Sequence, residues 1–340
     1  MRFVEALREG MRQEMERDAS VFVMGEGVGP HGSCFKQTDG FCAAFGVDRC
    51  RDTPISELAI AGAAVGAAMT GMRPIADLMW IDFSMLAADQ ICNQAAKLRY
   101  ISNGQVKVPL VIRMTTGAFK SNAAQHSGSF YSWYINTPGL KVVVPSNPYD
   151  AKGLIISAIR DDEPVIYLEH KALLNVRDDV PEEPYAIPLG VAEIKREGTD
   201  LTIVATGIEV THALKAAAML AEEGISAEVI DPRTLMPYDR DTILESVRKT
   251  GRLLAVDEGF RYCGFASEIV AMVAENTWDT LRCAPAENAW YTLRCSPRQV
   301  TPLHTTIPFS PPMENYIFPN PEKIANAARA LMASAKPAGV

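Results

Sequence analysis

The sequence lacks any apolar run of the length that a membrane-spanning helix needs, which is about 20 residues. It also lacks a stripe of lysine and arginine, and its formal net charge is −8. A nucleic-acid-binding surface is usually basic, so this composition disfavours that class of protein. We therefore expect neither a membrane nor a nucleic acid among the partners.

The cysteines and histidines show no pattern typical of metal ligands. The chain has seven cysteines, an odd number, and no two of them have the spacing of a CxxC pair. This disfavours both a zinc site and a framework of disulfides. Met1 leads directly into a helical apolar pattern, without the features of a signal peptide. We expect a reduced, cytoplasmic protein that holds no metal of its own.

The first half of the chain alternates short apolar runs with helical patterns. A length of 340 residues favours two domains, and a hydrophobic content of 48% supports sizeable cores. Short runs rich in valine, isoleucine and leucine are typical of parallel strands covered on both faces. The expected strands are Val21–Met24, Ile75–Met79, Val108–Arg113, Lys141–Pro145 and Pro164–Glu169.

Acidic residues and prolines gather after about residue 171 and indicate a linker. Beyond it, the expected strands Leu201–Ala205, Ala227–Ile230 and Leu253–Val256 again alternate with helices. This order predicts a second parallel sheet with right-handed crossovers. The fold class is therefore α/β with two parallel-sheet domains, over residues 1–180 and 198–340, joined by a linker over 181–197.

A segment near the C-terminus is repeated. Residues 275–286 recur with small changes as residues 287–298. Two copies are too few for a solenoid. We interpret the repeat as a local duplication that extends a surface connection, and we expect deletion of the second copy to be tolerated. The sequence leaves the role of this segment open.

Glu57 stands at the start of an expected helix of unusually small residues. Pro54 and Ser56 before it are typical of a helix start. Nine alanines and glycines then follow between positions 59 and 71. A helix with so little side chain allows another backbone to approach closely.

The surroundings of Glu57 point to proton exchange as one of two roles. We expect the carboxylate to lie among Ile55, Leu58 and Ile60, where it is poorly solvated. Such a group suits proton exchange with a bound heterocycle. The alternative is an acid that only complements the helix dipole.

Three further residues are candidates for the same site. Glu26 lies in a glycine-rich loop after the first strand, but the loop lacks the third glycine of a dinucleotide fingerprint. His126 lies in a loop of small polar residues, where a histidine is either solvated or catalytic. Phe83 follows a strand end, where its ring either packs in the core or stacks on a ligand.

The order and spacing of these motifs resemble the β subunit of the thiamin diphosphate-dependent first component of 2-oxo acid dehydrogenase complexes. This family includes the pyruvate, branched-chain and acetoin dehydrogenases and is transketolase-like. The likeness runs from about Phe3 to about Met332, nearly the whole chain. It is carried by segments 51–57, 74–84, 89–90, 123–127, 138–145 and 149–154, and segments 113–117 and 169–173 most resemble the acetoin branch.

The resemblance implies a pyrimidine-binding domain followed by a transketolase C-terminal-like domain. It implies that Glu57 shares a proton with the pyrimidine ring of thiamin diphosphate and that Phe83 lies against that ring. His126 would face the reacting carbon as a proton donor or as a stabiliser of the intermediate. Glu26 and Asp89 would belong to acidic pockets near the cofactor.

The resemblance also implies partners. The chain lacks the Gly-Asp-Gly motif with a downstream asparagine through which thiamin enzymes hold magnesium and the diphosphate. An α subunit would therefore hold both in an α2β2 heterotetramer. The enzyme would cleave a 2-oxo acid or acetoin and pass the acyl group to a lipoyl arm of an acyltransferase, the second component.

Two alternatives stay open. The first is the C-terminal half of a split transketolase, which would use a sugar aldehyde as acceptor instead of a lipoyl group. The second is a non-catalytic partner that keeps only the fold. The sequence does not identify the substrate among acetoin, pyruvate and branched 2-oxo acids. It also leaves open whether a structural monovalent cation is bound.

Overall fold

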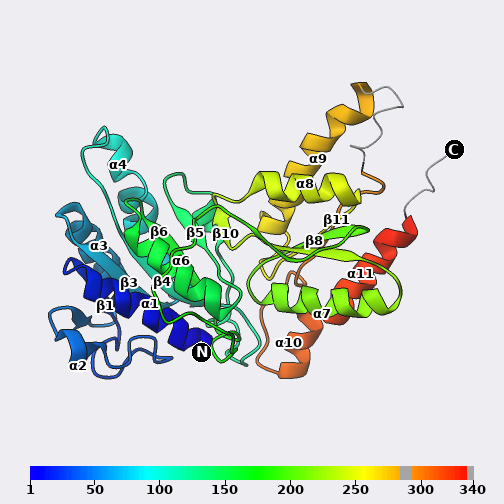
Figure 1. The fold of residues 1–340 in the computed structure, drawn as a ribbon. Coiled ribbons are helices and arrows are strands. Elements are labelled where there is room, and N and C mark those ends of the chain that lie inside the picture. The colour runs from blue at the N-terminus through cyan, green and yellow to red at the C-terminus, as the bar shows by residue number, and fades with distance from the viewer. Residues whose placement is uncertain (284–292, 335–340) are drawn as a thin grey trace. The chain divides into compact units, whose positions relative to one another are not determined.

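The computed structural model describes residues 1–283 and 293–334, apart from the side chains of residues 278–283. By its internal contacts the chain divides into two compact units (Figure 1). The first unit contains Met1–Leu189 and the short segment Thr234–Pro237, and the second contains the remainder. The domain boundaries expected from the sequence stay a prediction, and the end of the first segment at Leu189 falls inside the expected linker.

The first unit contains a seven-stranded sheet in the order β10-β5-β6-β4-β3-β1-β2. All neighbouring pairs are parallel except β10 and β5, which are antiparallel. Strands β1, β4 and β6 are buried along their whole length, as a sheet covered on both faces requires. The strands are β1 Val21–Gly25, β2 Cys50–Asp52, β3 Arg73–Trp80, β4 Val111–Thr116, β5 Lys141–Val143, β6 Val165–His170 and β10 Thr234–Met236.

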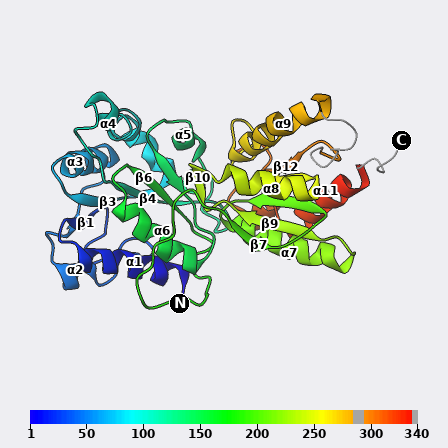
Figure 2. The same ribbon diagram turned by 45° about the horizontal axis from the view of Figure 1, so that its top comes forward.

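Helices cover both faces of this sheet (Figure 2). Helices α1 (Phe3–Arg17) and α6 (Pro148–Arg160) pack together on one face. Helix α3 (Glu57–Met69) packs on β3 together with η1 (Ile81–Ala87) and η2 (Asp89–Ala95). The shorter helices are α2 Phe41–Phe45, α4 Leu98–Ile101 and α5 Ser132–Ile135.

The second unit contains a five-stranded sheet in the order β12-β11-β8-β9-β7, parallel except for the β7–β9 pair. Helices α7 and α11 pack together on the core formed by one face, and α8 packs against β8 (Figure 1). The prediction of two α/β domains with largely parallel sheets is confirmed. The elements are β7 Glu193–Arg196, β8 Leu201–Ala205, α7 Ile208–Glu222, β9 Ala227–Asp231, α8 Arg240–Thr250, β11 Leu253–Val256, α9 Phe265–Cys283, β12 Arg298–Val300, α10 Pro311–Ile317 and α11 Pro321–Ser334.

Within the described residues, no helix has both the length and the apolar composition to cross a membrane. The same residues contain no group of three or more histidine, cysteine, aspartate or glutamate side chains placed to hold a metal ion. Helix α9 runs through most of the first copy of the repeat, while residues 284–292, which include the start of the second copy, lie outside the described residues.

Candidate active site

Four of the five candidate residues follow the carboxyl ends of neighbouring parallel strands. Strands β4, β3, β1 and β2 are neighbours in the sheet. His126 follows β4, Phe83 follows β3, Glu26 follows β1 and Glu57 follows β2. The carboxyl ends of adjacent parallel strands meet at one edge of a sheet, where ligands bind in open α/β folds. The topology therefore brings residues from four distant parts of the sequence to one edge of the first unit.

Glu26 lies in the glycine-rich turn that ends β1. The chain passes so close to β3 there that a Cβ on Gly25 would clash with the carbonyl oxygen of Asp77. Glu26 is buried, and its Oε1 atom has no hydrogen-bond partner among the described residues. Burial, with the charges of Glu57 and Asp77, raises the pKa of Glu26. A buried carboxylate oxygen without a partner is a candidate ligand contact.

Glu57 is the first residue of α3 and is only 5% exposed. Its surroundings differ in part from the expectation. Ile60 is buried, but Ile55 and Leu58 are 82% and 51% exposed. The acid therefore lies between a packed face and an open apolar surface. Glu57 and Glu26 are electrostatic neighbours, so the structure brings two carboxylates together at this edge.

Aromatic rings surround the imidazole of His126. Its centroid lies 5.3 Å from the Trp80 ring and 5.2 Å from the Phe83 ring, both in edge-to-face geometry. Phe35 also packs against Trp80, and the centroids of these two rings lie 5.3 Å apart. Phe83 is half-buried, so its ring both packs against His126 and remains partly accessible.

The loop of His126 is held by charged side chains. The ammonium group of the buried Lys171 donates to the carbonyl oxygen of His126 at 2.6 Å and to the hydroxyl of Ser127 at 2.9 Å. Asp82 accepts from the backbone N–H of Gly128 at 3.2 Å. Burial raises the pKa of Asp82, although the nearby Lys171 and His126 act in the opposite direction. These contacts fix the backbone that presents the imidazole.

Asp89, the fifth candidate, is exposed at the start of η2. Its carboxylate accepts hydrogen bonds from Asn93 at 2.7 Å and from Gln90 at 3.2 Å. Both partners belong to the same helix. These contacts are local, in contrast to the buried environment of Glu26 and Glu57.

A buried charge network joins three strands of the same sheet. Arg113 on β4 donates to both carboxylate oxygens of Glu169 on β6, at 2.8 and 2.9 Å, and pairs with Asp77 on β3. Ser33 donates to Asp77 at 2.9 Å, and Gln37 donates to Glu169 at 3.2 Å. The network therefore anchors the loop that follows Glu26.

The network combines two acids with one base. Burial raises the pKa of Glu169 to about 7, and the attraction of Arg113 only partly offsets this effect. Burial alone would lower the pKa of Arg113, but Asp77 and Glu169 raise it overall. Two carboxylates on one guanidinium favour a state in which one of them keeps a proton.

The sequence contains a signal for this network. Asp77, Arg113 and Glu169 are charged residues inside or at the end of the apolar runs from which the strands are expected. Asp77 is the direct register partner of Arg113. Glu169 lies two residues beyond Tyr167, the partner of Arg113 on β6, and therefore points to the same face of the sheet. A charge inside a buried strand needs a partner, so three such charges predict a cluster.

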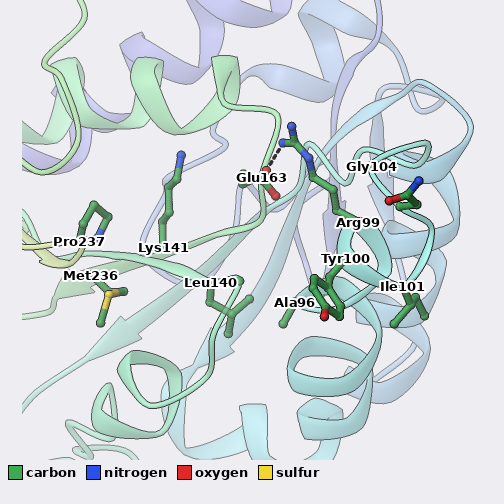
Figure 3. Close-up of a pocket in the computed structure, with 12 residues that line it drawn as sticks. Ala96, Arg99, Tyr100, Ile101, Gly104, Leu140, Lys141, Glu163, Met236 and Pro237 are labelled. Carbon is green, nitrogen blue, oxygen red and sulfur yellow. Dashed lines mark hydrogen bonds and ion pairs between the residues drawn. The ribbon is translucent and has the colours of Figure 1, made fainter.

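A separate pocket of about 950 Å³ lies in the first unit, near α4 (Figure 3). Its walls include Tyr100, Ile101 and Met236, and Arg99 forms an ion pair with Glu163 at its side. None of the five candidate residues lines this pocket. The residues expected to carry the chemistry therefore lie outside this pocket.

The side chains at the sheet edge fit a nitrogen heterocycle. Glu26 and Glu57 offer acceptor oxygens for ring or amino N–H groups, and one such oxygen has no partner within the described residues. Phe83 offers a partly accessible aromatic ring. The described residues offer no acidic cluster for a metal beside these groups.

Comparison with known proteins identifies both units. Residues 1–177 match the family described as transketolase, pyrimidine binding domain, and residues 190–324 match transketolase, C-terminal domain. A solved structure titled "Split gene transketolase, inactive beta4 tetramer" superposes with a TM-score of 0.79, covers 98% of each chain and is 22% identical. This last likeness shows the fold alone.

Relatives with higher identity indicate the branch of the family. The chain is 47% identical to the acetoin:2,6-dichlorophenolindophenol oxidoreductase subunit beta of Cupriavidus necator, with 97% of each chain covered. It is 49% identical to the pyruvate dehydrogenase E1 component subunit beta of Rickettsia felis, over 82% of this chain and 85% of the relative. The resemblance stated from the sequence is confirmed, and the chain belongs to the transketolase-like family of acetoin and 2-oxo acid dehydrogenase β subunits.

Proposed function

We propose that this β subunit supplies the pyrimidine-binding half of a thiamin diphosphate site in an enzyme that cleaves acetoin or a short 2-oxo acid. The observation that carries this proposal is the pair of buried acids, Glu26 and Glu57, with one carboxylate oxygen left without a partner in the described structure. When bound, thiamin diphosphate supplies the nucleophilic carbon and the electron sink for carbon–carbon cleavage.

The side chains of this subunit bind and orient the pyrimidine and move protons. Glu57, which is buried at the start of α3, shares a proton with a ring nitrogen. Glu26 accepts a hydrogen bond through its free Oε1 atom. Phe83 packs on the ring. His126, fixed through its carbonyl oxygen by Lys171, gives or takes a proton at the reacting carbon.

An α subunit completes the site in this proposal. The names of the relatives as β subunits support such a partner. We propose an α2β2 heterotetramer in which the α subunit holds magnesium and the diphosphate, because this sequence lacks the motif for them. The α subunit would cover the exposed apolar residues Ile55 and Leu58 and enclose Asp89.

The second unit has a separate role in this proposal, as the docking surface for a lipoyl acyltransferase. Its large exposed apolar side chains support this role, because such residues mark contact surfaces. They include Tyr262, Leu303, Phe309 and Tyr316. The six cysteines of the described residues are free thiols, which supports the cytoplasmic location we propose.

Acetoin is the substrate we favour. The relative named for acetoin covers 97% of this chain, and segments 113–117 and 169–173 resemble the acetoin branch. The β subunit assembled with its α subunit should reduce dichlorophenolindophenol faster with acetoin than with pyruvate or 2-oxoisovalerate. The alternative of a split transketolase rests on a likeness in fold only.

The test of the proposed chemistry is Glu57→Gln in the assembled enzyme. The amide keeps the size of the side chain but cannot exchange the proton, so turnover should fall by roughly 100-fold or more, the usual range for a lost acid–base group. The melting temperature and assembly with the α subunit should not change. Turnover is measured by dye reduction at saturating thiamin diphosphate.

A matched control separates chemistry from the helix dipole. Glu322 is the acid in the first turn of α11 and is exposed. Glu322→Gln should retain full turnover, because it removes the same charge from an equivalent helix position without touching the site. A Glu57→Gln enzyme with at least half of the parent rate would contradict the proposed role.

A further inference from the structure

A small pocket on the first unit is lined almost entirely by cations and apolar groups. It has a volume of about 380 Å³, and five of its nine lining residues are basic while none is acidic. We call it the basic pocket, and its cations are Arg2, Arg8, Lys36, Lys120 and Lys171. The positive charge of this pocket is opposite to the net charge of the chain, which has 41 acidic and 33 basic residues.

The ion pairs recorded for these cations involve few acids. Arg2 pairs with Glu5, and Arg8 lies 3.8 Å from Asp39. The ammonium group of Lys36 donates to the carbonyl oxygen of His31 at 2.6 Å. A neutral carbonyl group does not balance the charge of the lysine. Like charges gathered around a cavity raise each other's energy, and a bound anion relieves this repulsion.

The basic pocket is connected to the loop of His126 through two of its lining residues. The Nζ atom of Lys171 donates to the His126 carbonyl oxygen and lies 5.3 Å from the centroid of Trp80. Phe35 also lies 5.3 Å from Trp80. A ligand in the pocket would therefore contact side chains that pack around the active-site histidine.

We propose that the basic pocket binds an organic anion that carries two or more phosphate charges. Of the five cations, Lys36 and Lys120 have no ion pair with an acid among the described residues, so a single carboxylate would balance at most one of the two, whereas a diphosphate carries several charges. The guanidinium of Arg8 suits phosphate oxygens. Val4, Phe35 and Leu174 provide an apolar wall for the organic part. The volume is within the usual range for small-ligand sites, which begins at roughly 300 Å³.

Binding is tested by titration calorimetry of inorganic pyrophosphate into the full-length chain without its α subunit. The double variant Lys36→Gln, Lys120→Gln removes two exposed cations of the pocket. We expect at least a tenfold loss of affinity, as removal of charge-assisted hydrogen bonds predicts. The control Lys107→Gln removes an exposed lysine paired with Asp162 outside the pocket and should bind as the parent does.

Three results with variants or other anions would overturn the proposal, and a salt titration gives a fourth. The three are unchanged affinity in the double variant, equal loss in the control, and equal affinity of the parent for citrate and pyrophosphate. Titration of the parent at 50 and 200 mM NaCl gives a measurement that needs no variant. An affinity that does not fall with salt would exclude a cationic site.

The connection to His126 has its own optical test. Pyrophosphate should change the tryptophan fluorescence of the parent, because Lys171 and Phe35 both contact Trp80. The variant Trp80→Phe should lose this change while keeping its calorimetric affinity within about threefold. A fluorescence change that persists in Trp80→Phe would contradict the connection. None of these readouts depends on catalysis, so failure of the proposed enzymatic function would not affect them.

Discussion

Asp257 in the second unit and Glu26 in the first both follow the carboxyl end of a buried parallel strand, yet their hydrogen bonding differs. Asp257 is fully buried and accepts bonds from Thr206 at 3.1 Å, Gly259 at 3.0 Å and Ala266 at 3.1 Å. The Oε1 atom of Glu26 accepts none from the described residues. The residue after the strand end is therefore an acid with several hydrogen bonds in the second unit, and an acid with one unpartnered oxygen among the described residues in the first.

This difference is the one expected between a structural acid and an acid that binds a ligand. Backbone N–H groups that converge on Asp257 tie the loop before α9 to the sheet and use the acceptor capacity of the carboxylate. A buried oxygen without a partner costs free energy of folding, and such groups concentrate at binding sites. The comparison supports a ligand site at the edge of the first sheet and a structural role for the matching edge of the second.

The charge network beneath Glu26 should give the largest effect on stability. Arg113→Met leaves Asp77 and Glu169 buried without their common cation, and loss of one partner of a buried ion pair costs about 3–5 kcal/mol. Thermal unfolding of the full chain measures this change. The control Arg329→Met breaks an exposed pair with Glu223 in the second unit and should leave the melting temperature unchanged. Equal shifts in the two variants would show that the network does not hold the first unit together.

Amide substitutions at the two compared acids should give a smaller effect that differs between them. Asp257→Asn loses one acceptor oxygen beneath converging donors and should cost about 1–3 kcal/mol. Glu26→Gln removes a charge that burial and Glu57 disfavour, so the free energy of unfolding should be unchanged or higher. Denaturant unfolding of both variants at neutral pH tests the contrast. If Glu26→Gln lowered the free energy of unfolding as much as Asp257→Asn does, the two acids would not differ in the way we propose.

The last expected effect is a dependence of the free energy of unfolding on pH that comes from Glu169. The pKa of this group is raised from 4.5 to about 7 in the folded chain, mainly by burial. An acid with a raised pKa contributes stability below pH 4.5, and this contribution is lost as the pH rises towards about 7. Glu169→Gln cannot titrate, so its melting temperature should rise relative to the parent between pH 5 and pH 7.5.

The difference in melting temperature between parent and variant at the two pH values is the measurement. Other groups titrate in both proteins and cancel in this difference. Glu163→Gln, which removes a half-exposed acid paired with Arg99, serves as the control and should show no such trend. A relative melting temperature of Glu169→Gln that falls with rising pH would refute the upward shift.

Most strands of both sheets could be predicted from the sequence. The runs at Leu201–Ala205 and Leu253–Val256 are strands with those bounds, because short, nearly continuous apolar runs are typical of buried parallel strands. The strands that the sequence analysis missed are β2, β7, β10 and β12, which are short and lie at sheet edges or carry partly exposed residues. Such strands are specified by their neighbours and not by their own pattern.

The candidate site was predictable residue by residue but not as an arrangement. The motifs around Glu57, Phe83 and His126 pointed to their chemistry before the fold was known, and their roles stay predictions. Asp89 is exposed, in contrast to the buried Glu26 and Glu57, and the exposure of Ile55 and Leu58 was not expected. Exposure depends on which elements cover a helix face, and one sequence pattern fits both a core and a contact surface.

The sequence by itself determined the alternation of strands and helices, the family, and the acids and histidine that follow the strands. These properties depend on local residue order and on the period of apolar side chains. The tertiary structure alone decided that Thr234–Met236 adds an antiparallel edge to the first sheet. It also decided that Arg113 pairs with two acids and that five cations meet in one pocket. Pairing across strands depends on register, and register brings together residues whose separation along the chain carries no information about their contact.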